Sequence, residues 1–450
     1  MKIQAMNVTP VAMADAPLRN SVGVHEPYVN RVIVELVGED GRSGFGEASY
    51  STKLYADLLA LRERIVGADA LNTNKLYEIV TAHIAPPDAL PDALPDATGV
   101  DADHQADPAL KQFDLTPRRI NSALPRTFSP IEVAALDLGG QALGLPVAEM
   151  LGGRVRDAAP FSAYLFYKYA GGGGEGDDLR EDIYGEALTP DQIVQQARDF
   201  IDRYGFRSIK LKAGVFEPMV EADAIVALRD AFGPEMPLRI DPNAAWTVDT
   251  SIAVGERLDG TLEYFEDPTP GIDGMAAVRR GLLAKGIDLP NATNMCVTSF
   301  DDIPESNAKD AVQVILGDHH YWGGLRAVVE LGRICSTYHL GLSMHSNSHL
   351  GVSLMAMTHL AAATPGLTYD ADTHYPWLYP EDDIVQGGPI RFVDGAVPVP
   401  TTPGLGIEID RDALARGKER FDRIPYRDRD DTTYMRKVYD PTYEKRLPRW

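Results

Sequence analysis

The sequence is poor in cysteine and has no long apolar run. Cys296 and Cys335 are the only two cysteines among 450 residues, so we expect no disulfide framework and a reducing, cytoplasmic location. No apolar stretch is long enough to cross a bilayer. Residues 1–4 lead into a mixed segment that lacks the apolar core of a signal peptide. These absences argue against a disulfide-stapled secreted protein and against a membrane protein.

Basic residues are also scarce. There are 43 lysines and arginines against 66 aspartates and glutamates, and the formal net charge is −23. Nucleic acid requires a basic face, so it is not an expected partner. A small anionic ligand is still compatible with this charge wherever cations or a metal locally reverse the field.

Several common catalytic motifs are missing. The sequence has no Gly-x-Ser-x-Gly element, and neither cysteine has an obvious base nearby, so covalent hydrolysis is not expected. The glycine run 171–176 formally matches Gly-x-Gly-x-x-Gly, but Asp177 and Asp178 follow it where a pyrophosphate needs an uncharged helix terminus. We therefore predict a flexible loop there and no dinucleotide site.

The N-terminal part is predicted to form a small α+β unit. Residues 31–37 and 43–48 flank a glycine-containing turn and indicate a hairpin. Helical patterning covers residues 55–81. The acidic, proline-rich stretch 87–108 indicates a solvated loop.

A further helix is predicted to begin at Ser129. The sequence Ser129-Pro130-Ile131-Glu132 fits a capping box, because Ser129 can cap the first turn and Glu132 can reach back to it. This helix should end near Leu143, before a glycine and a proline.

Strand-like and helical segments alternate through most of the remaining chain, which favours a parallel barrel over an open sheet. The predicted strands are residues 162–169, 208–212, 238–241, 262–266, 292–294, 312–316, 341–345 and 367–370. Helices are predicted between some of them, at residues 193–204, 219–230 and 325–338. A last strand is predicted at 390–393, in a segment expected to return to the N-terminal unit.

Six of the predicted strands end in polar residues, which a barrel would gather around one mouth. They are Lys210 with Lys212, Asp241, Glu266, Asn294, Asp318 and His345. Side chains of a Lys-x-Lys pair project from the same face of a strand, and repulsion and burial would leave one lysine neutral near pH 7 as a base. The oxygens of Asp241, Glu266 and Asn294 suit Mg²⁺, although each residue alone could be a turn or cap residue.

The histidines allow more than one interpretation. Asp318 could hold His345 in one tautomer, as in an acid–base pair. A zinc site through His345 and His349 is a weaker hypothesis, because the glutamate of His-Glu-x-x-His is missing. We expect His349 to cap or pack at the start of the next helix. The adjacent His319 and His320 could compete as metal ligands, but loop histidines of this kind are expected at the polar surface.

With these residues in place, the chain resembles the enolase superfamily, and within it the glucarate dehydratases. The matching segments run in the family's order and cover most of the chain, namely residues 131–153, 210–212, 241–243, 266–268, 292–295, 345–349, 370–374 and 404–410. The resemblance implies an α/β fold, a (β/α)7β TIM-like barrel with an α+β capping domain formed from the N-terminal part and the C-terminal segment. The expected boundaries are 1–135 for the cap, 136–388 for the barrel and 389–450 for the returning segment.

The resemblance also implies roles by position. Lys212 would be one base, and Lys210 would lower its pKa and touch a substrate carboxylate. His345, oriented by Asp318, would be the base on the opposite face. The implied Mg²⁺ ligands are Asp241, Glu266 and Asn294. The further positions implied to be catalytic or to bind substrate are His25, Tyr164, Asn243, Ser346, Asn347, His374 and Arg429.

The implied activity is that of a hydro-lyase, the Mg²⁺-dependent dehydration of an acid sugar. D-glucarate, with L-idarate, would give 5-keto-4-deoxyglucarate by α-proton abstraction and β-elimination of water through an enediolate. Ala213 and Ala244 stand where the family often has glycine. The stretch 87–108 falls in the capping domain, which the resemblance implies contacts the far end of the substrate. It therefore bears on the identity of the substrate more than on the reaction type, and galactarate, talarate or a hexonate is the alternative substrate.

Two other functions fit the sequence less well. A catalytically silent binding protein would be expected to lack a base or a metal ligand, and none is missing. A zinc hydrolase on the same fold would need more histidines at the strand ends. The expected partners are therefore a small dicarboxylate sugar acid and further copies of the chain in a homo-oligomer, with no nucleic acid and no membrane.

Overall fold

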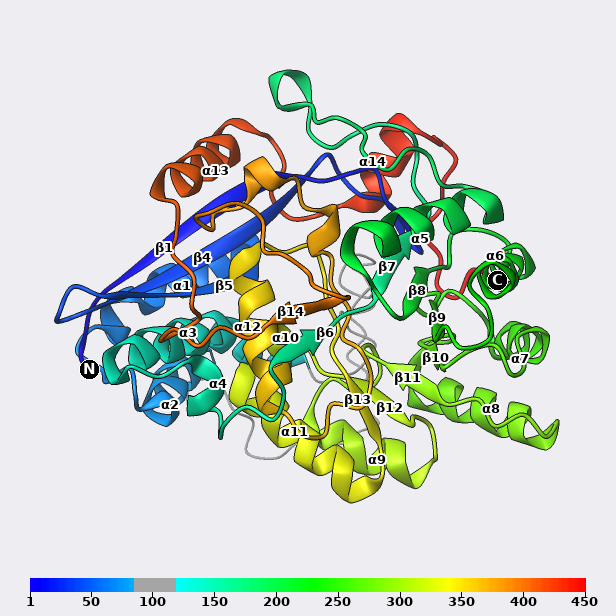
Figure 1. The fold of residues 1–450 in the computed structure, drawn as a ribbon, viewed down its shortest axis with the longest axis horizontal. Helices are drawn as coiled ribbons and strands as arrows, with labels where there is room; N and C mark the ends of the chain where they lie inside the picture. The colour runs from blue at the N-terminus through cyan, green and yellow to red at the C-terminus, as the bar shows by residue number, and fades with distance from the viewer. Residues whose placement is uncertain (85–118) are drawn as a thin grey trace.

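The computed structural model describes residues 1–84 and 119–450, and Figure 1 shows a capping sheet beside a curled parallel sheet. The cap contains a three-stranded antiparallel sheet of order β1-β4-β5. Its strands are β1 (Ile3–Ala14), β4 (Tyr28–Gly38) and β5 (Ser43–Ser49), and a short ribbon of β2 (Arg19–Asn20) and β3 (Gly23–Val24) lies between β1 and β4 in sequence. β4 and β5 are the predicted hairpin, which is confirmed. The loop predicted at 87–108 lies outside the described residues.

Helices α1 (Thr52–Ile65) and α3 (Arg119–Leu143) pack against this sheet, and α2 (Thr73–Ile84) packs against both of them. They share a buried apolar core with alternate residues of β4, among them Val32 and Val34. The helical patterning predicted over 55–81 is confirmed as two helices, because the chain leaves the helical conformation after α1 and Gly67 adopts a left-handed φ of 86°. Such a backbone angle suits glycine and interrupts a helix.

The predicted start of α3 at Ser129 is also wrong, while its predicted end at Leu143 is confirmed. The helix already runs through Ser129, whose hydroxyl is buried and has no hydrogen-bond partner among the described residues. Glu132 does not close a capping box. It accepts a hydrogen bond of 2.6 Å from the backbone N–H of Leu325 instead. The sequence does contain the capping pattern, but in the folded protein its glutamate binds the first turn of another helix.

The second domain is a barrel of parallel strands in sequential order. They are β7 (Ala163–Phe166), β8 (Ile209–Lys212), β9 (Leu238–Asp241), β10 (Tyr264–Glu266), β11 (Asn291–Thr293), β12 (Val314–Leu316) and β13 (Gly341–Ser343). The eighth predicted strand, 367–370, is not a regular strand. Its neighbourhood nevertheless occupies the eighth position, because Asp372 N–H donates to Met344 at 2.9 Å and Ser162 N–H donates to Ala371 at 2.9 Å. The predicted TIM-like barrel with a cap is thereby confirmed.

Helices connect the strands and lie outside the barrel (Figure 1). They are α5 (Pro190–Tyr204), α6 (Pro218–Phe232), α7 (Val248–Arg257), α8 (Gly271–Ala284), α9 (Ile303–Ala308), α10 (His319–Trp322), α11 (Leu325–Tyr338) and α12 (Gly351–Ala363), while the short α4 (Val147–Met150) precedes the barrel. α5 shows why such helices form where they do: Thr189 and Gln192 make a capping box, and Gly205 ends the helix in a left-handed conformation. Among the described helices, none combines the length and apolar character needed to span a bilayer.

The C-terminal segment returns across both domains (Figure 1). Its strand β14 (Ala396–Pro398) pairs antiparallel with β6 (Ala158–Pro160). α13 (Arg411–Arg423) packs against β1 of the cap, and α14 (Asp431–Val438) contacts β3. The strand predicted at 390–393 is wrong, since only Val393 makes a bridge, to Ala396, as part of a tight turn before β14.

Candidate active site

The polar strand-end residues meet at the carboxyl end of the parallel sheet. Lys212, Asp241 and Glu266 are the last residues of β8, β9 and β10. The next three strands β11, β12 and β13 are followed in the same way by Asn294, Asp318 and His345. Because neighbouring strands are in register, with Lys212 beside Asp241, these side chains lie around one mouth.

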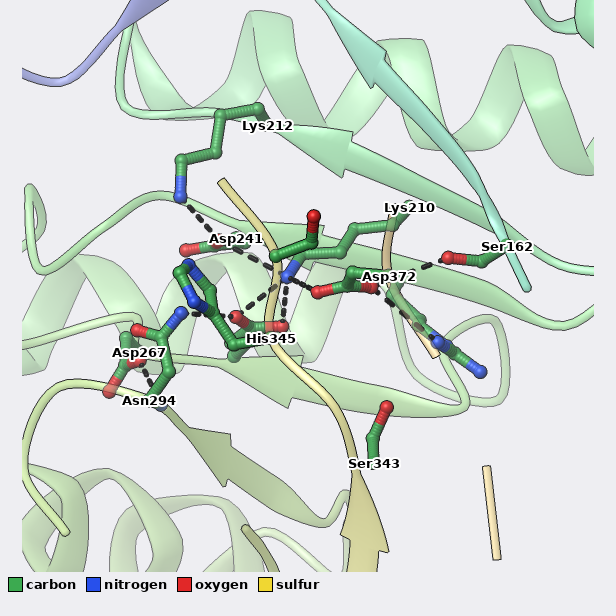
Figure 2. Close-up of polar contacts among 12 residues, drawn as sticks. Ser162, Lys210, Lys212, Asp241, Asp267, Asn294, Ser343, His345 and Asp372 are labelled. Carbon is green, nitrogen blue, oxygen red and sulfur yellow. Dashed lines mark hydrogen bonds and ion pairs between the residues drawn. The ribbon is translucent and has the colours of Figure 1, made fainter. Parts of the chain in front are cut away.

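Lys210 is completely buried among carboxylates (Figure 2). Its Nζ lies 2.7 Å from Oε1 of Glu266, 2.6 Å from Oδ2 of Asp372 and 3.4 Å from Oδ2 of Asp241. It also lies 4.7 Å from the ring centre of Tyr164. Burial alone would lower the pKa of Lys210, but Asp372 and Glu266 raise it well above its ordinary value. The expectation that repulsion leaves one lysine of the pair neutral therefore does not apply to Lys210.

Lys212 occupies a different environment. Its Nζ donates to Oδ2 of Asp241 and to Oδ1 of Asn243, each at 2.6 Å. Asn243 and Ala244 both have left-handed backbones, with φ of 54° and 59°. Alanine therefore stands at 244 in a conformation that favours glycine, which accounts for the glycine that the family often has there. The strained turn holds the Asn243 amide against Lys212.

The residues predicted to bind a metal form a cluster with excess negative charge. Asn294 Nδ2 lies 3.4 Å from Oε1 of Glu266, and Lys210 links Glu266 to Asp241. Burial and the neighbouring Asp241 raise the pKa of Glu266 well above its ordinary value, and burial raises that of Asp267 to about 7. A divalent cation would relieve this repulsion. Two carboxylates and an amide oxygen are the donors that Mg²⁺ prefers, so the residues fit this ion.

His345 is bound to Asp318. Its Nδ1 lies 2.9 Å from Oδ2 of Asp318, whose Oδ1 lies 2.7 Å from Nδ1 of His320. The expectation that His319 and His320 are surface loop residues is wrong. Both are buried in α10, because this helix packs against α3 of the cap. Asp318 begins the helix by accepting the backbone N–H of His320. Ligand atoms of Asp318, His319 and His320 lie within 4.8 Å of one another.

The weaker zinc hypothesis for His345 and His349 has no geometric support. Nδ1 of His349 lies 2.9 Å from the carbonyl oxygen of Leu350, and Nε2 lies 3.2 Å from Oγ1 of Thr373. His345 is bound to Asp318 instead. As predicted, His349 packs at the start of α12, where it is buried.

A cavity of 790 Å³ opens over these groups, between the barrel mouth and the cap. Lys212, Asn294 and His345 reach its wall. All seven residues predicted only by resemblance also line it, namely His25, Tyr164, Asn243, Ser346, Asn347, His374 and Arg429. Lys210, Asp241, Glu266 and Asp318 lie buried behind this wall. The predicted contact between Lys210 and a substrate carboxylate stays a prediction.

The cap side of the cavity carries its own charged network. His25 Nδ1 lies 3.0 Å from Oδ2 of Asp15, and Arg429 donates from Nε to Asp431 at 2.8 Å. Arg429 Nη1 lies 3.7 Å from Asp15. His25 follows β3 and Arg429 precedes α14, so the N-terminal and C-terminal segments together build this wall.

Sequence reasoning missed two residues of the buried cluster. Asp372 holds Lys210 and accepts from Oγ of Ser162 at 3.3 Å, and Asp267 accepts the backbone N–H of Asn294 at 2.8 Å. The sequence does contain a pattern that indicates Asp372, because this residue follows the eighth predicted strand just as the other site residues lie at the ends of the earlier strands. Asp267 lies directly after Glu266, and no pattern distinguishes it from an ordinary turn residue.

The fold and the site define a capped β/α barrel protein with lysine, histidine, carboxylate and amide groups at its strand ends. Residues 192–413 match the family model described as enolase C-terminal domain-like. A probable glucarate dehydratase from Streptomyces coelicolor is 44% identical over 454 residues, which covers 100% of this chain and 99% of that protein. The chain therefore belongs to the enolase superfamily.

Solved structures support the same membership. An enolase from Mycobacterium smegmatis complexed with tartrate is 50% identical, with a TM-score of 0.87 over 100% of this chain and 98% of that one. An enolase from Pseudomonas fluorescens with bound magnesium, potassium and tartrate is 43% identical, with a TM-score of 0.89 over 100% of this chain and 99% of that one.

Proposed function

We propose that the protein is a Mg²⁺-dependent hydro-lyase that dehydrates an acid sugar, D-glucarate and its epimer L-idarate, to 5-keto-4-deoxyglucarate. One observation carries the proposal: Lys212 and His345 both reach the cavity wall beside the oxygen donors of Asp241, Glu266 and Asn294. Two groups that exchange protons, next to a hard-cation site, are what abstraction of a proton beside a carboxylate requires.

The relatives favour the same substrate class. The similar protein from Streptomyces coelicolor is a probable glucarate dehydratase, and the similar structures from Mycobacterium smegmatis and Pseudomonas fluorescens hold tartrate, a hydroxylated dicarboxylate. The latter also holds magnesium. In this chain, Asp241, Glu266 and Asn294 would hold the ion. When bound, Mg²⁺ supplies positive charge that stabilises the negative charge developing on the substrate carboxylate as the α-proton leaves.

The protein's own residues would then move the protons. Nζ of Lys212, held by Asp241 and Asn243, accepts the α-proton of one epimer. Because Nδ1 of His345 is bound to Asp318, its Nε2 is left to accept the α-proton of the other epimer. Protonated His345 then donates to the β-hydroxyl as its C–O bond breaks, so one water leaves and the resulting enol ketonises.

A substrate screen in D₂O tests this proposal. Acid sugars, with galactarate, talarate and hexonates beside D-glucarate and L-idarate, are incubated with Mg²⁺ and followed by proton NMR. We expect dehydration of D-glucarate, loss of about 10²–10⁴-fold in rate for Lys212→Met and for His345→Gln, and exchange lost at a different epimer in each variant. Full activity in either variant would overturn the assignment, and turnover of galactarate alone would change the substrate.

Metal removal gives a second test. Chelation should stop turnover, and Mg²⁺ should restore it. The ion should also raise the thermal midpoint of the wild type, because a ligand that binds only the folded state stabilises it by about 2.7 kcal/mol at a hundredfold excess over Kd. Glu266→Gln, which removes one ligand charge, should show a much smaller rise. Turnover that survives exhaustive chelation would exclude the magnesium role.

A further inference from the structure

His320 lies behind the Asp318–His345 pair and is bound on both of its ring nitrogens. Its Nδ1 lies 2.7 Å from Oδ1 of Asp318, and its backbone N–H donates to the same oxygen at 2.8 Å. The other oxygen of Asp318, Oδ2, is left to His345. His320 and Asp318 are both buried, with 5% and 2% of their surface exposed. Asp318 therefore has one oxygen for each histidine.

Arg31 of the cap determines which nitrogen of His320 carries the proton. Its Nη2 lies 3.3 Å from Nε2 of His320, and Oγ of Ser353 lies 3.0 Å from the same nitrogen. A guanidinium can only donate, so Nε2 of His320 must accept and the single ring proton must lie on Nδ1, facing Asp318. A doubly protonated ring would place two donors against each other.

The cap holds Arg31 firmly in this position. Arg31 is completely buried on β4, donates from Nε to Oε1 of Glu47 at 2.6 Å and also bonds Ser49, both on β5. Glu47 in turn accepts the backbone N–H groups of Leu350 and Ser353 at the start of α12, each at 2.9 Å. The guanidinium also makes a cation between Asp318, His319 and His320 unfavourable, since it would lie beside that ion.

We propose that His320 is a positioning residue: fixed by Arg31 as its Nδ1–H tautomer, it anchors Oδ1 of Asp318 so that Oδ2 orients His345. The proposal rests on the proposed function for its kinetic consequence, but its geometric content does not depend on the substrate. Burial would raise the pKa of the Asp318 carboxyl, yet the hydrogen bonds that it accepts from His320 and His345 help to hold it below its ordinary value. Asp318 thus stays an anion that accepts from both rings.

The arrangement makes the base dependent on the cap. Arg31 also donates from Nη1 to Oδ1 of Asn347 at 3.0 Å, two residues after His345 in the same loop. One arginine of β4 therefore holds the loop that carries His345 and, through His320, the carboxylate that orients it. Lys212 has no contact with this network among the described residues.

Two polar substitutions distinguish the role of Nδ1 of His320 from that of Nε2. His320→Asn places an amide near the position of Nδ1 and keeps a donor for Asp318, whereas His320→Gln places it near Nε2 and loses that donor. α-Proton exchange in D₂O is measured for each epimer, with His345→Gln and Lys212→Met defining which exchange each base performs. We expect His320→Gln to slow the His345-dependent exchange by about 10–100-fold, as supporting partners of a histidine typically do. Lys212-dependent exchange should stay within about threefold, and His320→Asn should recover most of the loss.

The matched control is His319→Gln, a buried histidine of the same short helix whose ring centre lies 3.9 Å from that of His320. Its Nδ1 lies 3.9 Å from Oδ1 of Asp318, which is beyond hydrogen-bond distance, so both exchanges should be kept. Equal losses at both epimers, or no loss with His320→Gln, would overturn the proposal. So would failure of a folded His320→Asn variant to recover exchange.

A measurement without substrate distinguishes failure of this inference from failure of the proposed function. Selective ¹⁵N labelling of the histidines, with His320→Asn to assign the signal, reports the tautomer of His320 by NMR. The expected result at pH 7 is a protonated Nδ1 and an unprotonated Nε2. The opposite tautomer, or a doubly protonated ring, would refute the inference even in an active enzyme. If no acid sugar exchanges a proton while this tautomer is found, the proposed function fails alone.

Discussion

Lys210 is held by attractions that pull it in two directions. On one side are Asp241 and Glu266, which we propose as magnesium ligands, and on the other is Asp372 at 2.6 Å. Asp372 is itself fixed by Ser162 and lies 3.9 Å from Nη1 of Arg239. Asp372 accepts one of the hydrogen bonds of the Lys210 ammonium. Lys210 therefore uses less of the hydrogen-bonding capacity of Asp241 and Glu266 on the other side. A residue outside the metal site thereby affects how available its ligands are.

The change Asp372→Asn should raise the Mg²⁺ requirement. An amide keeps the shape but removes the charge, so Lys210 shifts its hydrogen bonds toward Glu266 and Asp241 and competes with the ion. We expect the Mg²⁺ concentration for half-maximal activity to rise about tenfold, equivalent to about 1.4 kcal/mol, and the free energy of unfolding to fall by about 3 kcal/mol as the buried pair is broken. Metal titrations of activity and urea unfolding measure the two effects.

The control for this change is Asp370→Asn. Asp370 lies two residues earlier, and its carboxylate accepts from Oγ of Ser208 at 2.7 Å. No contact with Lys210 is seen in the described structure, so the Mg²⁺ requirement should stay unchanged. An unchanged requirement in Asp372→Asn as well would show that Lys210 does not compete with the ion.

At the level of elements, sequence patterns located the strand ends but not what lies behind them. β9 and α11 have the predicted bounds, because a short β-branched run or a long amphipathic stretch is visible locally. The contact between Arg31 and His320 joins residues 289 positions apart, and no local pattern encodes it. The same limit applies to His319 and His320, because two adjacent polar residues indicate a surface position, whereas in the folded protein the cap covers them.

Helix α3 shows a different error, because its local capping pattern predicts a helix start that tertiary packing overrides. The glutamate of this pattern, Glu132, leads to a pH prediction. Glu132 accepts a backbone N–H in the first turn of α11, whose N-cap residue Gly324 has no side chain to cap the helix. Burial raises the pKa of Glu132 from 4.5 to about 7. A raised folded-state pKa means that the stabilising contribution is complete below pH 4.5 and is lost as the pH rises through 7.

The free energy of unfolding of Glu132→Gln should therefore increase relative to that of the wild type as the pH rises. The glutamine amide can still accept the Leu325 N–H but cannot ionise. From pH 4.5 to 8, we expect the free energy of unfolding of the wild type to fall relative to that of Glu132→Gln, by at most about 3 kcal/mol. Urea unfolding at several pH values measures this difference. Glu419→Gln, at an exposed position of α13, is the control and should show a constant difference. A constant difference for Glu132→Gln would mean that the carboxyl is ionised throughout.

The whole molecule is joined at Asp382, where three distant parts of the chain meet. Its Oδ2 accepts the backbone N–H of Ala14, at the end of β1, at 2.8 Å. Its Oδ1 accepts from Nη2 of Arg180 at 2.5 Å and lies 2.9 Å from Nη2 of Arg420 in α13. The side chain of Asp382 is completely buried. The cap strand, the loop after β7 and the C-terminal helix thus share one carboxylate, which sets how the wall around His25 is assembled.

Removing this carboxylate should loosen the assembly without touching the proposed catalytic groups. Asp382→Ala leaves Arg180 and Arg420 partly unpaired in a buried setting, so we expect a loss of about 3 kcal/mol in the free energy of unfolding and faster proteolysis within the C-terminal segment. The neighbouring Glu381 also pairs with Arg180, at 3.2 Å, but its side chain is 56% exposed. Glu381→Ala should therefore cost at most about 1 kcal/mol. Because both variants remove a carboxylate from the same arginine, equal losses would show that burial of Asp382 does not matter, and that the C-terminal helix is held mainly by its apolar face.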